Sequence, residues 1–558
     1  MPIKLSKEDQ EFRNRQITPI DAKVVDLERM LVNLFMLVKY NGKRPVARSS
    51  RTLITLQDLR ERLTADVTRQ RGLAAYPVII EKWLASDLVD MVYRGVPGKE
   101  AVASPRPLHL DAYRLRNSKH TRDYNASDQI YGLLQYADPS VIDALRTLFE
   151  SDENSQAANG RLDLDTLVVQ RLVTGPDLRD YAGSPRSELS TQPLSPAAAY
   201  LLTDDMQRLL AYKAVVPRHV LLDYLTTLLG VHLGLYMLRL FHLLPGYVRA
   251  GEMGGDCPHC HGPHADDFMA TCRYKPLLLV DMGKDARGTM AALAQDNAAA
   301  HYARINNYIR AVFTINQLLS SITSDYQWHG GLASVADALA FYKEPPPHFQ
   351  SMFHLRVNSL FQDLKRQRDE AAEQTANPRA RAREMAQWAE IDAIRDMKLS
   401  PFDTFIEVVT YARTPFHRQY HVQLVDSLLQ KNDESGLLLQ GRARANARRF
   451  HIGSRLLEAL AQIAVLEPDS SGSPQGYRTR PMLVDEFVDW LRDRYGLVIN
   501  GLDLPDLARN AGVRELEAFR DNLVAFKGRL REIGFYTDMS DAYNGQTIRP
   551  RYSLEQPV

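Results

Sequence analysis

The stretch Val220–Leu238, VLLDYLTTLLGVHLGLYML, decides the fold class of this chain. It is rich in leucine, valine and tyrosine, but it carries Asp223 and His232, and Arg239 follows at once. A charged group in the middle of a membrane span costs roughly 2.5 to 3.5 kcal/mol on insertion scales. A buried core helix of a large α-rich domain accounts for the same pattern without that cost. The stretch therefore predicts a mainly helical protein, and a membrane-associated effector is kept only as a third hypothesis.

Length and composition are those of an ordinary soluble protein, with 558 residues, 45% hydrophobic and 25% charged side chains. At about 150 residues per domain, this length predicts roughly four domains. The formal net charge of +1 excludes a globally basic surface, so any contact with nucleic acid must come from a local patch. The N-terminus has no apolar signal segment, and three cysteines are too few for a disulfide-stapled secreted protein. We therefore expect a cytoplasmic protein.

The N-terminal domain is predicted to span residues 1–120. Apolar residues recur with helical spacing from Val24 to Val38, and further helices are expected from Thr55, where Asp58 supports a cap, and from Pro77. Strands are expected at 91–93 and 107–110, around a loop rich in glycine and proline. Three helices followed by a strand, a turn and a strand are the order of a winged helix-turn-helix, and any small α+β domain fits it equally well.

The C-terminal domain is predicted to span residues 478–558. A helix face from Leu483 to Leu491 precedes a short helix at Leu504–Asn510. A longer helix follows, from Leu516 to Ile533, with Gly534 placed to end it. Asn544-Gly545 is a hairpin-turn signal. The order again favours a winged-helix-like module.

The rest of the chain is predicted to be helical. The segment EPDSSGSPQG, Glu467–Gly476, has the composition of a linker. The expected fold class is therefore mainly α (α+β), a multidomain helical protein with winged-helix-like modules at both ends and a small zinc-binding insertion. Between the terminal domains we expect a central helical domain at 121–345 with the insertion at 254–273, a helical domain at 346–466, and a linker at 467–477.

All three cysteines lie in one segment, DCPHCHGPHADDFMATC, which ends at Cys272. Cys257-x2-Cys260 is a usual metal-chelating spacing, because both thiolates can face one point. Cys272 supplies a third sulfur, and one of the three histidines of the segment must supply the fourth ligand. His264 has the most freedom to reach the metal, although which histidine completes the set stays open. The segment predicts a structural zinc held by Cys257, Cys260, His264 and Cys272.

The spacing of these four residues resembles a zinc knuckle, but the gap before Cys272 is too long, so knuckle-type RNA binding does not carry over. A thioredoxin-type redox pair is the weaker interpretation, because no βαβ unit surrounds the cysteines. A deaminase-type catalytic zinc requires His-x-Glu upstream and a proline before the first cysteine, and Asp256 stands at that place.

Residues 277–281, LLLVD, predict a buried strand that ends in the carboxylate of Asp281, with Gly283 and Lys284 after it. A nuclease of the carboxylate-and-lysine type needs Asp/Glu-x-Lys, so the match is imperfect. An aspartate that caps the next helix is the alternative interpretation. Arg444 and His451 have the Arg-x4–6-His spacing of some helical ribonucleases, a spacing loose enough to recur by chance.

An arginine patch lies between Gly436 and Leu457, a stretch that holds no aspartate, glutamate or lysine. Arginine suits bidentate contacts with phosphate, which give salt-sensitive and largely sequence-independent binding. A solvated helix face, or a surface for an acidic partner protein, is the alternative. The patch predicts nucleic-acid binding through Arg442, Arg444, Arg448, Arg449 and Arg455.

The C-terminal runs DEFVDWL (485–491), RYGLVI (494–499) and GFYTD (534–538) resemble the ends of proteins of bacterial antiphage defence islands, of the methylation-associated defence system type. The resemblance spans about 60 residues and implies one component of a multi-protein system that restricts invading DNA. It assigns no active-site residue.

Together these observations favour a non-enzymatic, zinc-stabilised component of a bacterial antiviral defence system. It would bind DNA or RNA through the phosphate backbone, or act as a scaffold for other proteins of the same system. The alternative is a nuclease or other hydrolase with a site near Asp281.

Overall fold

Helices hold most of the residues described in the computed structural model, and the strands are short. This confirms the mainly helical fold class. The chain divides into two units. Unit 1 comprises Met1–Thr18, Leu238–Pro258 and Ala300–Gln423, and unit 2 comprises Pro19–Met237, His259–Ala299 and Leu424–Val558. The described residues are 3–44, 54–64, 75–150, 163–173, 192–254, 257, 272–324, 334–374, 378–441, 447–469, 476–536 and 546–554.

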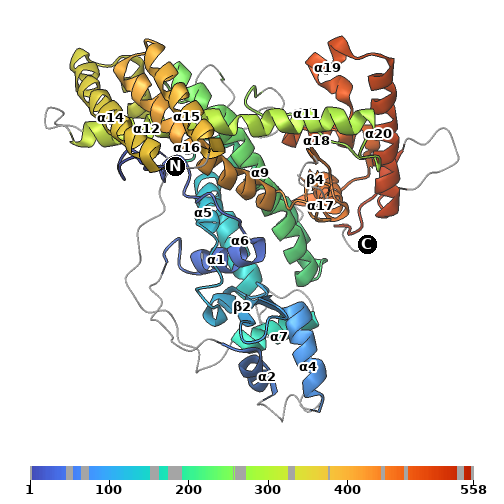
Figure 1. Ribbon diagram of the computed structural model, residues 1–558. Helices are drawn as coiled ribbons and strands as arrows, with labels where there is room; N and C mark the ends of the chain where they lie inside the picture. Colours follow the sequence, from blue (N-terminus) through green and yellow to red (C-terminus); the bar gives the residue numbers. More distant parts are fainter. Residues whose placement is uncertain are drawn as a thin grey trace. The chain divides into compact units, whose positions relative to one another are not determined.

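Unit 1 is a group of helices (Figure 1). It contains the last parts of α9 (Arg218–Ala250) and α11 (Thr289–Ala303), then α12 (Ile305–Ser324), α13 (Val335–Lys343), α14 (Pro347–Gln374), α15 (Pro378–Asp396) and most of α16 (Pro401–Leu428). Helices α11 and α12 follow each other with one residue between them.

Aromatic side chains form the core of unit 1. The Phe353 ring on α14 lies 4.8 Å from the Phe402 ring and 5.6 Å from the Phe405 ring, both on α16. The N-terminal segment is fastened to this core by polar contacts. Arg356 Nη2 on α14 lies 2.5 Å from the carboxylate of Asp9.

Two buried histidines of α16 complete this core. The His417 ring stacks on the Phe12 ring at 3.9 Å, and the His421 Nδ1 donates to the His417 carbonyl at 2.7 Å. Burial lowers the pKa of His417 to about 3, with the nearby charges of His421 and Arg413 acting in the same direction. Burial likewise lowers the pKa of His421 to about 4. Both side chains are therefore neutral in the folded protein at pH 7.

Acidification should therefore destabilise unit 1. The unfolded chain takes up protons below its ordinary histidine pKa of about 6.5, whereas the folded chain does not until the pKa of each buried ring is reached. Stability should fall from pH 6.5 downward, by up to about 2 kcal/mol per histidine at pH 5. Denaturant unfolding of the wild type and of a His417→Leu/His421→Leu variant at pH 7 and pH 5 measures this. An equal loss in both proteins would contradict it.

Unit 2 begins with a helical half. Its elements are α1 (Leu27–Lys39), α2 (Leu56–Thr64), α4 (Pro77–Trp83), η1 (Leu84–Leu88), β1 (Val89–Val92), β2 (Ala101–Pro105), η2 (Leu110–Leu115), α5 (Ala126–Ala137), α6 (Ser140–Glu150), α7 (Leu164–Val173), α8 (Pro196–Ala211), η3 (Tyr212–Ala214) and the first part of α9.

The second half of unit 2 carries most of its short strands. Its elements are β3 (Leu278–Leu279), the first part of α11, β4 (Leu438–Gln440), β5 (Arg448–Phe450), α17 (Ser454–Ala464), β6 (Leu466–Pro468), β7 (Tyr477–Thr479), β8 (Met482–Leu483), α18 (Val484–Tyr495), β9 (Leu497–Val498), η4 (Gly501–Asp503), α19 (Pro505–Asn510), α20 (Val513–Glu532) and β10 (Thr547–Ile548).

Helix α9 contains the apolar stretch Val220–Leu238. Within the described residues it is the one helix long and apolar enough to cross a membrane, and 94% of its apolar window is buried within the protein, as in a core helix. Two glycines one turn apart permit close packing within unit 2. A Cβ on Gly230 would lie 2.9 Å from the Leu428 carbonyl oxygen, and one on Gly234 would lie 2.3 Å from the Leu429 side chain.

The N-terminal elements follow the predicted order in part. The cap of α2 is confirmed, since the Asp58 amide donates to Thr55 Oγ1 and the Asp58 carboxylate accepts from the Thr55 amide. The strand expected at 107–110 is wrong. The strand that pairs antiparallel with β1 is instead β2, which ends at Pro105, before the predicted segment. Pro107 has no N–H to give to a ladder, and the His109 side chain instead accepts from the Asp111 amide and caps η2.

The C-terminal helices are confirmed as α18, α19 and α20. Helix α18 ends at Gly496, which has a φ of +75°, and a Cβ there would lie 2.0 Å from the Pro276 carbonyl oxygen. Strand β8 pairs antiparallel with β10, and β6 with β7, so the two ends of the predicted linker lie side by side. Asn544 and Gly545 lie outside the described residues. The winged-helix character of both ends and the domain limits stay predictions.

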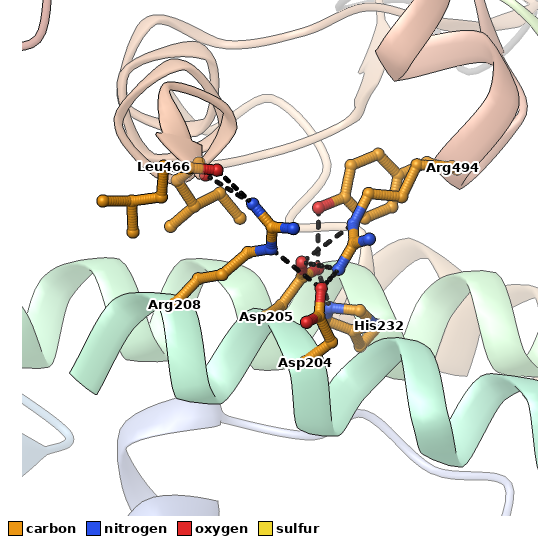
Figure 2. A network of polar contacts seen from close by, with 8 residues as sticks. Asp204, Asp205, Arg208, His232, Leu466 and Arg494 are labelled. Carbon is orange, nitrogen blue, oxygen red and sulfur yellow. Dashed lines mark hydrogen bonds and ion pairs between the residues drawn. The ribbon is translucent and has the colours of Figure 1, made fainter. Parts of the chain in front are cut away.

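A buried charge network holds α18 against α8 and α9 (Figure 2). Arg494 Nη2 lies 2.6 Å from Asp205 Oδ1 and also contacts Asp204. His232 Nε2 donates to the Asp205 carboxylate at 2.7 Å, and the Tyr495 hydroxyl donates to the same carboxylate at 2.6 Å. Burial alone would raise the pKa of Asp205, but the charge of Arg494 and the hydrogen bond from His232 outweigh it and hold that pKa well below its usual range.

The same α8 turn extends the network to the strand after α17. Arg208 Nε donates to Asp204 at 2.8 Å, and its Nη1 donates to the Leu466 carbonyl at 2.7 Å (Figure 2). Four segments of unit 2, α8, α9, α18 and the start of β6, are thus joined through one set of polar contacts.

Removing Arg494 should therefore be strongly destabilising. An Arg494→Met variant leaves the fully buried Asp205 without its cationic partner, a loss of about 3–5 kcal/mol in the free energy of unfolding. Arg492→Met on the same helix is the matched control, because its partners Asp489 and Asp493 are 59% and 43% exposed and each pair should contribute within about 1 kcal/mol. Equal losses in chemical denaturation of the two variants would contradict the role given to Arg494.

Candidate functional site

Three short strands of unit 2 run parallel and end at one edge. Strand β3 pairs with β9, and Val280 forms a parallel bridge with Phe450 at the end of β5. The Asp281 amide donates to the Phe450 carbonyl at 3.0 Å and the Val280 amide to the Val498 carbonyl at 2.9 Å. The residues directly after β3, β5 and β9 therefore lie together, which is where ligands bind in many parallel sheets. The strand predicted at 277–281 is confirmed at its centre, as β3 and the bridge at Val280.

Asp281 lies at the centre of this edge. Its side chain is 1% exposed, and its Oδ2 lies 2.9 Å from Nε of Arg449, which is also buried. Oδ1 accepts from the Gly283 amide at 2.8 Å. Burial raises the pKa of Asp281, while the Gly283 amide and the charge of Arg449 oppose that rise. The carboxylate is thus enclosed and paired, and it holds the loop after β3.

His451 follows β5 and contacts the start of the same loop. Its Nδ1 donates to the main-chain carbonyl of Asp281 at 2.7 Å. A carbonyl can only accept, so the proton is on Nδ1 and the lone pair is on Nε2. Burial lowers the pKa of His451, and the hydrogen bond to Asp281 and the charge of Asp281 raise it by a smaller amount. The pKa therefore lies below the ordinary histidine value, and the ring is neutral at pH 7.

Asn522 on α20 was not predicted from the sequence, and it ties two strand ends together. Its Nδ2 donates to the Val280 carbonyl at 2.9 Å and to the Ile499 carbonyl at 2.8 Å. Its Oδ1 accepts from the Met282 amide at 2.7 Å. The available signal was an amide on the apolar face of a helix, between Phe519 and Phe526.

The predicted arginine patch is divided by the structure. Arg448 forms two contacts with Asp426, at 2.8 and 2.9 Å, and Arg449 is buried against Asp281. Both therefore stabilise the chain itself, whereas Arg455 is exposed at the start of α17. Arg442 and Arg444 lie outside the described residues.

The predicted metal ligands are only partly described. Cys257 and Cys272 are both buried, and Cys260 and His264 lie outside the described residues. Within the ranges described above, no group of three or more histidine, cysteine, aspartate or glutamate side chains forms a metal site. Two buried thiols at the ends of the histidine-rich segment have the donor chemistry that zinc prefers.

One comparison with known proteins identifies a family. The family of the methylation-associated defense system protein MAD7 matches residues 7–552. The chain belongs to this family. The resemblance seen in the last 60 residues is thereby confirmed and extends over most of the chain, which gives the protein a role in an antiphage defence system. No curated protein and no solved structure matches the chain.

A structural role for Asp281 predicts a specific pattern of stability. Asp281→Ala should lower the free energy of unfolding by about 3–5 kcal/mol, because Arg449 is left buried without its partner. The double variant Asp281→Ala/Arg449→Met should recover a large part of that loss. Chemical denaturation of the single and double variants measures the coupling. An Asp281→Ala protein as stable as the wild type would contradict this role.

Proposed function

We propose that this protein is a non-enzymatic, zinc-stabilised component of its defence system that binds nucleic acid and assembles with other proteins of the system in the cytoplasm. The observation that carries the non-enzymatic part is the state of Asp281. It is the carboxylate that the sequence offers for hydrolysis, and it is enclosed and neutralised by Arg449. A carboxylate that binds a metal or activates water needs access to substrate.

The arrangement of the two ends supports the proposal that they are winged-helix-like modules. Near the N-terminus, the three predicted helices are α1, α2 and α4, the last of which continues directly into η1, and they precede the paired strands β1 and β2. Near the C-terminus, α18, α19 and α20 precede β10, which pairs with β8. Such modules bind nucleic acid or other proteins, and membership of a multi-protein system makes its other members the expected partners.

Nucleic-acid binding is tested with the exposed Arg455 and with Arg442 and Arg444, the two predicted patch arginines that lie outside the described residues. A triple variant Arg442→Ala/Arg444→Ala/Arg455→Ala should bind duplex DNA and RNA at least tenfold more weakly, with a flatter dependence on salt, because each lost phosphate contact removes about 0.9 from the salt slope on duplex DNA. Arg15→Ala/Arg366→Ala/Arg418→Ala, which replaces three exposed arginines of unit 1, is the control and should bind as the wild type does. Fluorescence anisotropy at several salt concentrations measures both. Unchanged binding by the first variant would remove the patch from the proposal.

The same preparations test the alternative function. Degradation of DNA or RNA by the pure wild-type protein, lost in Asp281→Asn with the fold intact, would replace the non-enzymatic proposal with a hydrolase.

The zinc proposal predicts about one zinc per chain in the purified protein. Cys257→Ser and Cys272→Ser should each lose the metal and lower the melting temperature, since binding of a structural zinc contributes directly to folding. His264→Ala should behave like the cysteine variants, whereas His259→Ala and His261→Ala should keep the metal. Elemental analysis and thermal unfolding measure these outcomes. Absence of zinc from the protein, or Cys257→Ser with unchanged stability, would contradict the proposal.

A further inference from the structure

The edge formed by the ends of β3, β5 and β9 carries three groups that are exposed or partly exposed and that the buried Asp281–Arg449 pair does not use. Lys284 lies in the loop after β3, and its side chain is 86% exposed. Arg529 lies on α20, seven residues and thus about two turns beyond Asn522, which holds the ends of β3 and β9. His451 follows β5 and contacts the Asp281 carbonyl.

The two cations meet at one carboxylate. Glu532 lies 2.7 Å from Arg529 Nη1 through Oε2 and 3.7 Å from Lys284 Nζ through Oε1. Both pairs are partly or largely exposed, so each contributes at most about 1 kcal/mol and can be exchanged for a stronger anion. A single carboxylate between a lysine and an arginine therefore marks a place where a phosphate group can be bound.

Arg529 also lies within electrostatic reach of His451. After burial, the charge of Arg529 is among the influences that lower the pKa of His451, and it acts in the same direction on Glu434, whose pKa is lowered first by hydrogen bonds from Ser454. Glu434 is thus occupied by the Ser454 amide, at 3.2 Å, and by the Ser454 hydroxyl. Asp285, whose charge acts on Asp281, accepts from the Arg287 amide at 2.9 Å.

The His451 ring supplies an acceptor beside these cations. With the proton on Nδ1 and directed at the Asp281 carbonyl, Nε2 offers a lone pair, and among the described residues it has no hydrogen-bond partner. A DNA backbone carries acceptors only, whereas an RNA backbone carries one donor in each nucleotide, the 2′-hydroxyl. An acceptor next to phosphate-binding cations therefore distinguishes RNA from DNA.

We propose that this edge binds the sugar–phosphate backbone of RNA, with Lys284 and Arg529 on a phosphate and His451 Nε2 accepting from the adjacent 2′-hydroxyl. The proposal rests on the proposed function insofar as the chain binds nucleic acid, and it names RNA as the preferred class. It is independent of the arginines at 442, 444 and 455.

The experiment compares single-stranded RNA and DNA oligonucleotides of one sequence, with binding followed by fluorescence anisotropy over a range of salt concentrations. The wild type should bind RNA about fivefold to tenfold more tightly than DNA, the range expected for one additional hydrogen bond. His451→Phe should abolish that preference while changing DNA affinity little. Lys284→Ala and Arg529→Ala should weaken binding to both, each reducing the salt slope by about 0.7.

Arg520→Ala is the matched control, because Arg520 lies nine residues before Arg529 and hence on the opposite face of α20. Its binding and salt slope should equal those of the wild type. An RNA in which every 2′-hydroxyl is replaced by 2′-fluorine removes the donor without changing the protein. It should bind the wild type as weakly as DNA does, which keeps the test valid if His451→Phe does not fold.

The outcomes separate the two proposals. A wild type that binds neither RNA nor DNA overturns the proposed nucleic-acid function together with this site. A wild type that binds both equally, or a preference for RNA that persists in His451→Phe and with the fluorinated RNA, overturns the inference and leaves the proposed function standing. Unchanged salt slopes in Lys284→Ala and Arg529→Ala also overturn it.

Discussion

The ion pair between Arg494 and Asp205 is the constraint on which unit 2 depends. Both groups are fully enclosed, and a charge in that environment must be compensated where it lies. Arg494 therefore fixes the rotation of α18 about its own axis, since no other orientation returns the guanidinium to Asp204 and Asp205. Gly496 follows two residues later and permits the turn that leads into β9. The position of β9 next to β3, and with it the edge at Asp281, follows from that orientation.

The same device recurs at the other junctions of this half of the chain. Arg449 meets Asp281 where β5 joins β3, and Asn522 donates to carbonyls at the ends of β3 and β9. Apolar residues of similar size would stabilise these junctions as well or better, because desolvation of charge is costly. What polar partners add is direction: a guanidinium or an amide satisfies its partners in one arrangement only. Strands of two or three residues have few ladder bonds of their own, so their register depends on such contacts.

The limits of sequence-based prediction follow from distance along the chain. Periodicity located α18, α19 and α20, the capping pair Thr55–Asp58 and the strand before Asp281, because each depends on neighbours within a few residues. The partners of Arg494 lie 289 residues away, and no local pattern names them. The arginine patch was read from its charge alone, and the aspartates that pair with Arg448 and Arg449 lie outside that stretch of sequence. The strand expected at 107–110 failed because an apolar run containing proline does not reveal whether its amides have a ladder to join.

The contrast between buried and exposed charges also decides which groups of this edge can meet a ligand. Asp281 and Arg449 neutralise each other away from water, and separating them would leave two uncompensated buried charges. Lys284 and Arg529 are neutralised by the exposed Glu532, and water can replace either partner at little cost. Ligand binding at this edge is therefore expected of Lys284, Arg529 and His451, whose ring is oriented by the main chain of Asp281 and not by its carboxylate. Asp281 thus acts in the structure through its carboxylate, which pairs with Arg449 and accepts from the Gly283 amide, and through its main-chain carbonyl, which orients His451.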